Sequence, residues 1–184
     1  VAFTMEKIRP KNLPALLPIS DFDEINIRTY VKSYNKTGVY FLSIEGGKSL
    51  SCKIAKGISE LPYRFSEIKR TEKKYQSRNT VYNDSLEIEF TVGKEQSRKT
   101  ELDKWLTERY ALFQDTEKSI NEFEIHHLEW PINEIELHKL DINYPRFEKL
   151  INKKPSKTHY SKGVKVIAWG KVKKEKTDYN KTYK

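Results

Sequence analysis

The sequence has little cysteine, no long apolar run and none of the short motifs that mark common enzymes. Cys52 is its one cysteine, which excludes an internal disulfide and is usual in a reducing cytoplasm. No run of about 18 apolar residues is present, which excludes a membrane-spanning helix. Phosphate-binding glycine loops, zinc-spaced Cys or His pairs and serine nucleophile elbows are also missing. We therefore expect no cofactor, no metal and a cytoplasmic location.

Positive charge is abundant but spread out. The 184 residues carry a formal net charge of +9, and lysines scatter through turns, strand ends and a basic tail over 171–184, which is predicted to be flexible. This charge favours solubility or a nucleic-acid surface. Since basic residues do not align with aromatic side chains on any one strand, nucleic acid is the less favoured partner. A homo-oligomer remains open.

The chain is organised around residues 24–44, which read as a β-hairpin. Apolar and polar side chains alternate over 24–32, a polar turn ends at Gly38, and an aromatic, apolar strand resumes over 39–44. Ile25 and Ile27 share one face of the first strand. The opposite face carries Asn26, Arg28 and Tyr30, the first candidates for a binding site.

Other segments extend this β pattern into one domain over residues 1–170. Strands are predicted over 1–5, 63–71, 73–82, 85–92, 107–114, 121–130, 132–140 and up to Trp169. Leu50, Ile54 and Ile58 recur every four residues and predict a helix that buries this stripe. A capping box, Thr100 to Asp103, predicts a second helix. The predicted fold class is mainly β (α+β): an antiparallel, closed or nearly closed barrel with two or three short helices and space for a small ligand.

The pair His126-His127 is the first candidate for chemistry. Adjacent residues on a strand point to opposite faces, so a metal site would need one ring together with Glu108, Glu129 or His138. One histidine acting in hydrogen bonding or proton transfer, and a structural role for both, are the alternatives.

Arg109 and Arg28 each allow two interpretations. Arg109 either forms an ion pair with Glu108 inside the fold or holds a carboxylate ligand, and Arg28 is open to the same alternatives. Tyr30, Trp130 and Trp169 are more typical of a core than of ligand walls. Cys52 lies in an apolar helical stretch and is predicted to be a buried, unreactive thiol.

Six ordered blocks resemble the YqjF-like family of uncharacterised bacterial proteins, a domain of unknown function. The resemblance covers residues 1–169 and implies that the chain lacks the N-terminal segment with which family members begin. The blocks are DFDEINIRTYV, TGVYFLSI, ISELPY, WLTERYALF, IHHLEWPI and VKVIAW.

That family in turn looks like a distant relative of acetoacetate decarboxylase, a barrel around an internal cavity. The resemblance implies a cavity here, but it places Tyr63 where the decarboxylase has its Schiff-base lysine and Gly57 where it has an acidic residue. A tyrosine cannot form the imine. Schiff-base decarboxylation is therefore not expected.

The first functional hypothesis is a barrel that binds a small organic molecule, anionic or carbonyl-bearing. An enzyme acting on a small carbonyl compound, with His126 or His127 as acid or base, is the second. Nucleic-acid binding is the third. The predicted ligand contacts are Arg28, Tyr30, Tyr63, Arg109, His126 and His127.

Overall fold

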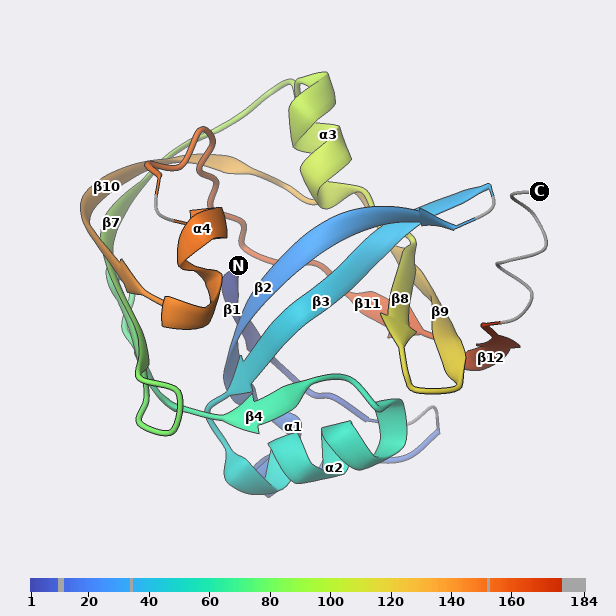
Figure 1. The fold of residues 1–184 in the computed structure, drawn as a ribbon. Helices are drawn as coiled ribbons and strands as arrows, with labels where there is room; N and C mark the ends of the chain where they lie inside the picture. Colours follow the sequence, from blue (N-terminus) through green and yellow to red (C-terminus); the bar gives the residue numbers. More distant parts are fainter. Residues whose placement is uncertain (10–11, 34, 152, 177–184) are drawn as a thin grey trace.

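Two β-sheets form the framework of the chain in a computed structural model, which describes residues 1–9, 12–33, 35–151 and 153–176 (Figure 1). The larger sheet has the order β1-β2-β3-β8-β9-β11, with β4 added to β3 and β12 to β9. Its strands are β1 (Ala2–Met5), β2 (Phe22–Ser33), β3 (Lys36–Gly46), β4 (Tyr63–Phe65), β8 (Ala111–Asp115), β9 (Ser119–His127), β11 (Val166–Ala168) and β12 (Val172–Glu175).

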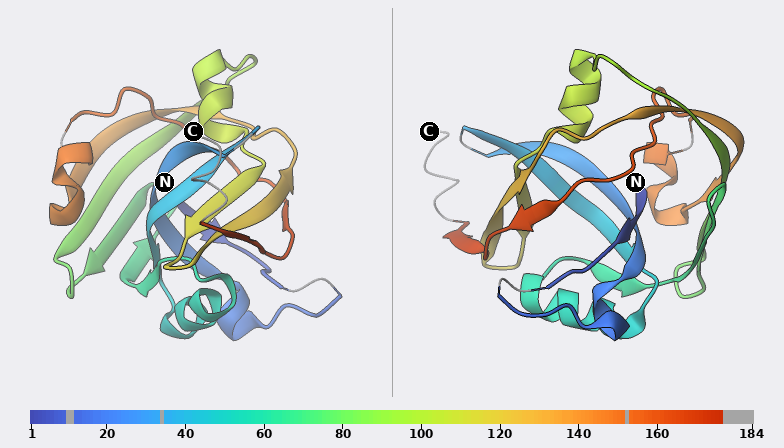
Figure 2. Two further views of the ribbon diagram at one scale, coloured as in Figure 1. Left: turned by 45° about the vertical axis from the view of Figure 1, so that its right-hand side comes forward. Right: turned by 180° about the vertical axis from the view of Figure 1, so that it is seen from behind.

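The smaller sheet has the order β10-β7-β6-β5 and is antiparallel throughout. It stands on one side of the β2–β3 hairpin, and β8 and β9 lie on the other side (Figure 2). Its strands are β5 (Glu67–Arg70), β6 (Lys74–Asn79), β7 (Asp84–Glu95) and β10 (Asn133–Asn143). The described helices are all short: α1 (Leu17–Ser20), α2 (Ser49–Ser59), α3 (Glu101–Thr107), α4 (Glu148–Ile151) and the 3-10 turn η1 (Pro145–Phe147).

The predicted hairpin is confirmed as β2 and β3. Their register runs from Glu24 opposite Gly46 to Ser33 opposite Lys36, with a shift after Ile27 that leaves Leu42 of β3 unpaired. Because the extra residue lies on β3, the alternation of β2 is uninterrupted. Glu24, Asn26, Arg28 and Tyr30 therefore share one face of β2, which we call its polar face.

The predicted mainly β (α+β) fold class is confirmed, but the described residues form no closed antiparallel barrel. The strands form two sheets, and β3 pairs in parallel with both β4 and β8. The segment predicted as one strand over 63–71 breaks at Ser66, which is buried and whose amide donates to the carbonyl of Gly46. The chain there leaves the larger sheet as β4 and enters the smaller sheet as β5.

The apolar face of β2 packs against the smaller sheet. Ile25 joins Tyr75, Leu86 and Tyr144 in the buried cluster, and Ile27 packs at its edge. Burial of this face is the main driving force that holds the sheets together. It leaves the polar face of β2 directed away from the smaller sheet.

The predicted phase of α2 is wrong. Leu50, Ile54 and Ile58 are 58%, 39% and 71% exposed, whereas Ser51 and Cys52 are buried. The small side chains face inward because β3 runs close beneath them: a Cβ built on Gly46 would lie 2.5 Å from the Cys52 sulfur. Burial raises the pKa of the Cys52 thiol to about 11, in agreement with the predicted unreactive thiol.

The capping box of α3 is confirmed and extended. Thr100 Oγ1 accepts from the Asp103 amide, and the Asp103 carboxylate accepts from the Thr100 amide. The same buried carboxylate contacts Lys157 Nζ at 2.9 Å and His159 Nε2 at 2.6 Å. Burial alone would raise the pKa of Asp103, but the hydrogen bonds from Thr100 and Lys157 outweigh it and lower the pKa.

The end of the described chain is a strand. β12 pairs with β9 inside the segment predicted as a tail, and the rest of that prediction, 177–184, lies outside the described residues. No helix in the described part of the chain has the length and apolar content needed to cross a membrane.

Candidate functional site

The polar face of β2 changes character along the strand. Glu24 and Asn26 are buried, whereas Arg28 and Tyr30 are half-buried near the end of α3. The parallel pairing of β3 with β8 brings the α3–β8 connection, and with it Arg109, beside the hairpin. Three of the predicted ligand contacts, Arg28, Tyr30 and Arg109, are thereby brought together.

The C-terminal end of α3 anchors this group. Arg28 Nη2 and Tyr30 Oη both donate to the carbonyl of Leu106, at 3.4 Å and 3.0 Å. Arg109 Nη1 donates to Thr37 Oγ1 at 3.3 Å. Side chains from two segments far apart in the sequence therefore converge on one place.

Aromatic rings contact both guanidinium groups. The Tyr30 and Trp105 ring centroids lie 4.2 Å apart. The Arg109 guanidinium carbon lies 4.8 Å from the Trp105 centroid and 5.5 Å from the Tyr30 centroid, and that of Arg28 lies 5.7 Å from the Tyr30 centroid. Such cation–π contacts stabilise a positive charge without neutralising it. We call Arg28, Tyr30, Trp105 and Arg109 the arginine site.

The arginine site has more hydrogen-bond donors than acceptors. Arg28 Nε and both Nε and Nη2 of Arg109 are buried without a hydrogen-bond partner. Within the described ranges, no carboxylate lies within 4.0 Å of either guanidinium. Buried donors without acceptors are costly, and two unpaired guanidinium groups are suited to a carboxylate or another planar anion.

Among the residues that the structure describes, Glu108 and Arg109 do not form the predicted ion pair. Glu108 instead pairs with Lys99, and both side chains are largely buried. Burial alone would raise the pKa of Glu108, but hydrogen bonds from Lys99, Thr107 and the Trp130 amide outweigh it and lower the pKa. The sequence predicted that both residues lie in one strand. Instead, Glu108 caps the end of α3 and Arg109 follows it outside any strand.

The two histidines have different surroundings. His127 is buried, stacks on Tyr110 with centroids 4.8 Å apart, and contacts two backbone carbonyls: Nδ1 that of Leu128 at 2.7 Å and Nε2 that of Arg109 at 3.2 Å. His127 thus supports the backbone that carries Arg109. His126 is exposed at the same strand. In the described part of the chain, no three His, Cys, Asp or Glu side chains are grouped to hold a metal.

Tyr63 lies at the inner end of the same polar face, outside the arginine site. Its hydroxyl donates to Glu24 Oε2 at 3.0 Å, and Asn26 Nδ2 donates to Glu24 Oε1 at 3.3 Å. Burial raises the pKa of Glu24 to about 7, which the hydrogen bonds from Asn26 and Tyr63 oppose. Burial also raises the pKa of Tyr63. Glu24, which the sequence did not single out, is the residue that Tyr63 contacts.

Comparison with known proteins gives the family of the chain. A family model described as an uncharacterized conserved protein, DUF2071, matches residues 1–165. The chain belongs to this family. The uncharacterized protein YqjF of Bacillus subtilis (strain 168) is 26% identical over 188 residues, which cover 91% of this chain and 72% of YqjF. The predicted resemblance to YqjF-like proteins is confirmed.

A second polar cluster of this DUF2071 member lies between its two sheets. Arg64 Nη2 contacts Glu45 Oε1 at 2.7 Å and Asp84 Oδ2 at 2.6 Å, and Arg146 Nη2 contacts the same Asp84 oxygen at 3.0 Å. Ser66 and Ser77 donate to the other oxygen of Glu45. Its charged groups are paired with one another, and the buried Arg64 Nε that has no partner is matched by an acceptor without one, Asp84 Oδ1. This cluster therefore joins the sheets and has no net excess of donors.

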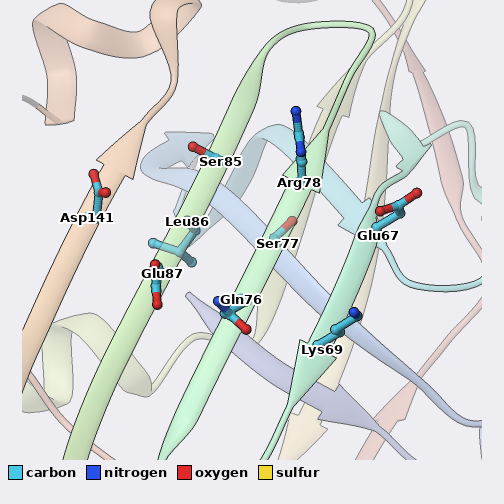
Figure 3. A pocket seen from close by; sticks show the side chains of 9 residues that line it. All are labelled: Glu67, Lys69, Gln76, Ser77, Arg78, Ser85, Leu86, Glu87 and Asp141. Carbon is cyan, nitrogen blue, oxygen red and sulfur yellow. The ribbon is translucent and has the colours of Figure 1, made fainter.

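Two surface hollows lie away from the arginine site. One of about 340 Å³ lies over β5, β6, β7 and β10, where polar side chains such as Gln76, Arg78 and Ser85 line it (Figure 3). The other, of about 210 Å³, lies between α2 and β4 beside Tyr63 and Cys52. Arg28 and Arg109 line neither hollow. The arginine site is therefore distinguished by its buried N–H groups without acceptors and not by the size of a hollow.

Proposed function

We propose that this protein binds a small organic anion through its carboxylate at the arginine site. The observation that carries the proposal is the set of buried N–H groups on Arg28 and Arg109 that have neither an acceptor nor a counter-ion in the described part of the chain. A carboxylate accepts several hydrogen bonds and neutralises the local charge at the same time.

The aromatic members of the site extend this proposal to the rest of the ligand. Trp105 is 48% exposed, so a ligand can reach the site from solvent, and its ring is available to stack on an apolar or planar group. Small carboxylates with an attached apolar part, such as benzoate, match this combination better than an inorganic anion. The described strands form two sheets and not a closed barrel, so the site lies beside the hairpin and not in a lumen. The fold-level analogy with acetoacetate decarboxylase stays a prediction.

Calorimetric titration with acetate, benzoate and succinate tests the proposal. We expect at least one to bind, and we expect Arg28→Gln and Arg109→Gln to weaken that binding by about tenfold or more, because each removes charge-assisted hydrogen bonds. Arg98→Gln is the matched control, since Arg98 is exposed and outside the site. The proposal fails if none of the three anions binds, or if the control weakens binding as much as the site variants do.

A further inference from the structure

The inner and outer ends of the polar face of β2 carry opposite charges. Glu24, 2% exposed, and Arg28 lie on the same face of one strand with Asn26 between them. At about 3.3 Å per residue their Cα atoms are about 13 Å apart. The space between them is protein interior, where charges are screened less than in water.

Glu24 is surrounded mainly by neutral groups. Tyr63 of β4 and Asn26 of β2 donate to its carboxylate, and Tyr75 of β6 donates to its backbone carbonyl. In the described chain the carboxylate has no ion-pair partner. The other titratable or charged groups that act on it are the Cys52 thiol of α2 and the Arg28 guanidinium.

We propose that anion binding at the arginine site is coupled to proton uptake by Glu24, so that the protein binds its ligand together with a proton. The inference rests on the proposed function. A carboxylate bound at Arg28 cancels the positive charge that favours ionised Glu24, and it adds a negative charge on the same face. The Glu24 carboxylates that are still ionised then take a proton from solvent and become neutral carboxylic acids, so that uptake is at most one proton per bound anion.

The sign and size of the coupling follow from electrostatics. Burial raises the pKa of Glu24 to about 7 and Arg28 opposes that shift, so neutralising Arg28 raises the pKa further and proton uptake is largest near neutral pH. Two unit charges about 13 Å apart at an effective dielectric constant of about 20 change an equilibrium by about tenfold. We expect affinity to increase about three- to tenfold as the pH falls from 8 to 6.

Calorimetry in buffers of different ionisation enthalpy measures the proton directly. Titrations with acetate, benzoate and succinate are carried out at pH 7 in phosphate and in Tris. The difference between the two observed heats, divided by the difference in buffer ionisation enthalpy, should correspond to uptake of a fraction of one proton per bound anion. Glu24→Gln should bind the same anion with no proton uptake and no pH dependence between pH 6 and 8. Glu134→Gln, at an exposed position, is the control and should match the parent protein.

Tyr63→Phe provides an independent readout if Glu24→Gln does not fold. Loss of the Tyr63 donor destabilises ionised Glu24, so the midpoint of the pH dependence should move to higher pH. Binding with equal heats in both buffers, or proton uptake that persists in Glu24→Gln, overturns the coupling and leaves the proposed function standing. If none of the three anions binds in either buffer, both proposals fail.

Discussion

Glu24 and Glu45 are both almost fully buried on the hairpin, yet their surroundings differ in kind. Glu45 is paired with Arg64 and receives hydrogen bonds from Ser66 and Ser77. Glu24 receives hydrogen bonds only from neutral donors among the groups described. A buried carboxylate without a cationic partner is costly in its charged form. Glu24 is therefore the carboxylate on this hairpin whose ionisation opposes folding.

Glu24→Gln should stabilise the protein at alkaline pH. Because the folded pKa of about 7 lies above the ordinary glutamate value of 4.5, the folded state holds the proton more tightly, and stability is lost as the pH rises from about 4.5 through 7. The variant should gain about 1–3 kcal/mol at pH 8 and little at pH 4.5. Urea unfolding at both pH values measures this. Greater stabilisation at pH 4.5 than at pH 8 would contradict it.

Among the elements, β3 determines where the arginine site forms. Near its start, Val39 and Tyr40 pair in parallel with Leu112 and Phe113 of β8, which places the α3–β8 connection against the hairpin. Gly38 permits this contact, since a Cβ built there would lie 2.5 Å from the Ala111 carbonyl oxygen and 2.7 Å from the Phe113 ring. Any side chain at position 38 must push β8 away from β3.

Gly38→Ala should therefore weaken both folding and anion binding. We expect a loss of about 1–3 kcal/mol in the free energy of unfolding, as for other overpacked sites, and weaker binding because Arg109 moves with β8. Gly57→Ala is the control: a Cβ there meets nothing within 4 Å, and replacing a helical glycine should stabilise by about 0.5–1 kcal/mol. Urea unfolding and calorimetry distinguish the two. Equal effects of both substitutions would show that the packing at Gly38 is unimportant.

Local patterns predicted the local elements, and non-local packing decided the rest. Alternation over β2 and the Thr100 capping box depend on neighbours within a few residues, and both are confirmed. The buried face of α2 was mispredicted because the close approach of Gly46 to Cys52, and not hydrophobicity, sets the helix phase. The sequence predicted Arg28, Tyr30 and Arg109 as ligand contacts. It could not show that Trp105 packs against them or that Glu108 forms its ion pair with Lys99.

At the scale of the whole molecule, one ion network joins the two sheets. Glu45 of β3 and Arg64 of β4 belong to the larger sheet, Asp84 belongs to β7 of the smaller one, and Arg146 approaches from η1. Both arginines also pack on the Tyr82 ring, at 4.7 Å and 3.9 Å from its centroid. Removal of one member leaves a buried charge without compensation.

Arg64→Met should be strongly destabilising. It keeps most of the side-chain volume but leaves Glu45 without its ion-pair partner and Asp84 with Arg146 alone, for an expected loss of about 3–5 kcal/mol. Arg78→Met, at an exposed position of β6, should change stability by no more than about 0.5 kcal/mol. Chemical denaturation of both variants is the measurement. A similar small change in both would mean that the network contributes little to the union of the sheets.

The hydrogen bond from Arg28 to the Leu106 carbonyl joins residues 78 positions apart in the chain. Such a contact requires closure of a long loop, which costs conformational entropy. The two halves of the arginine site are thus brought together only when β8 has docked on β3. A molecule trapped before that step would have an intact hairpin but no affinity for an anion, and a bound anion would favour completion of folding by mass action.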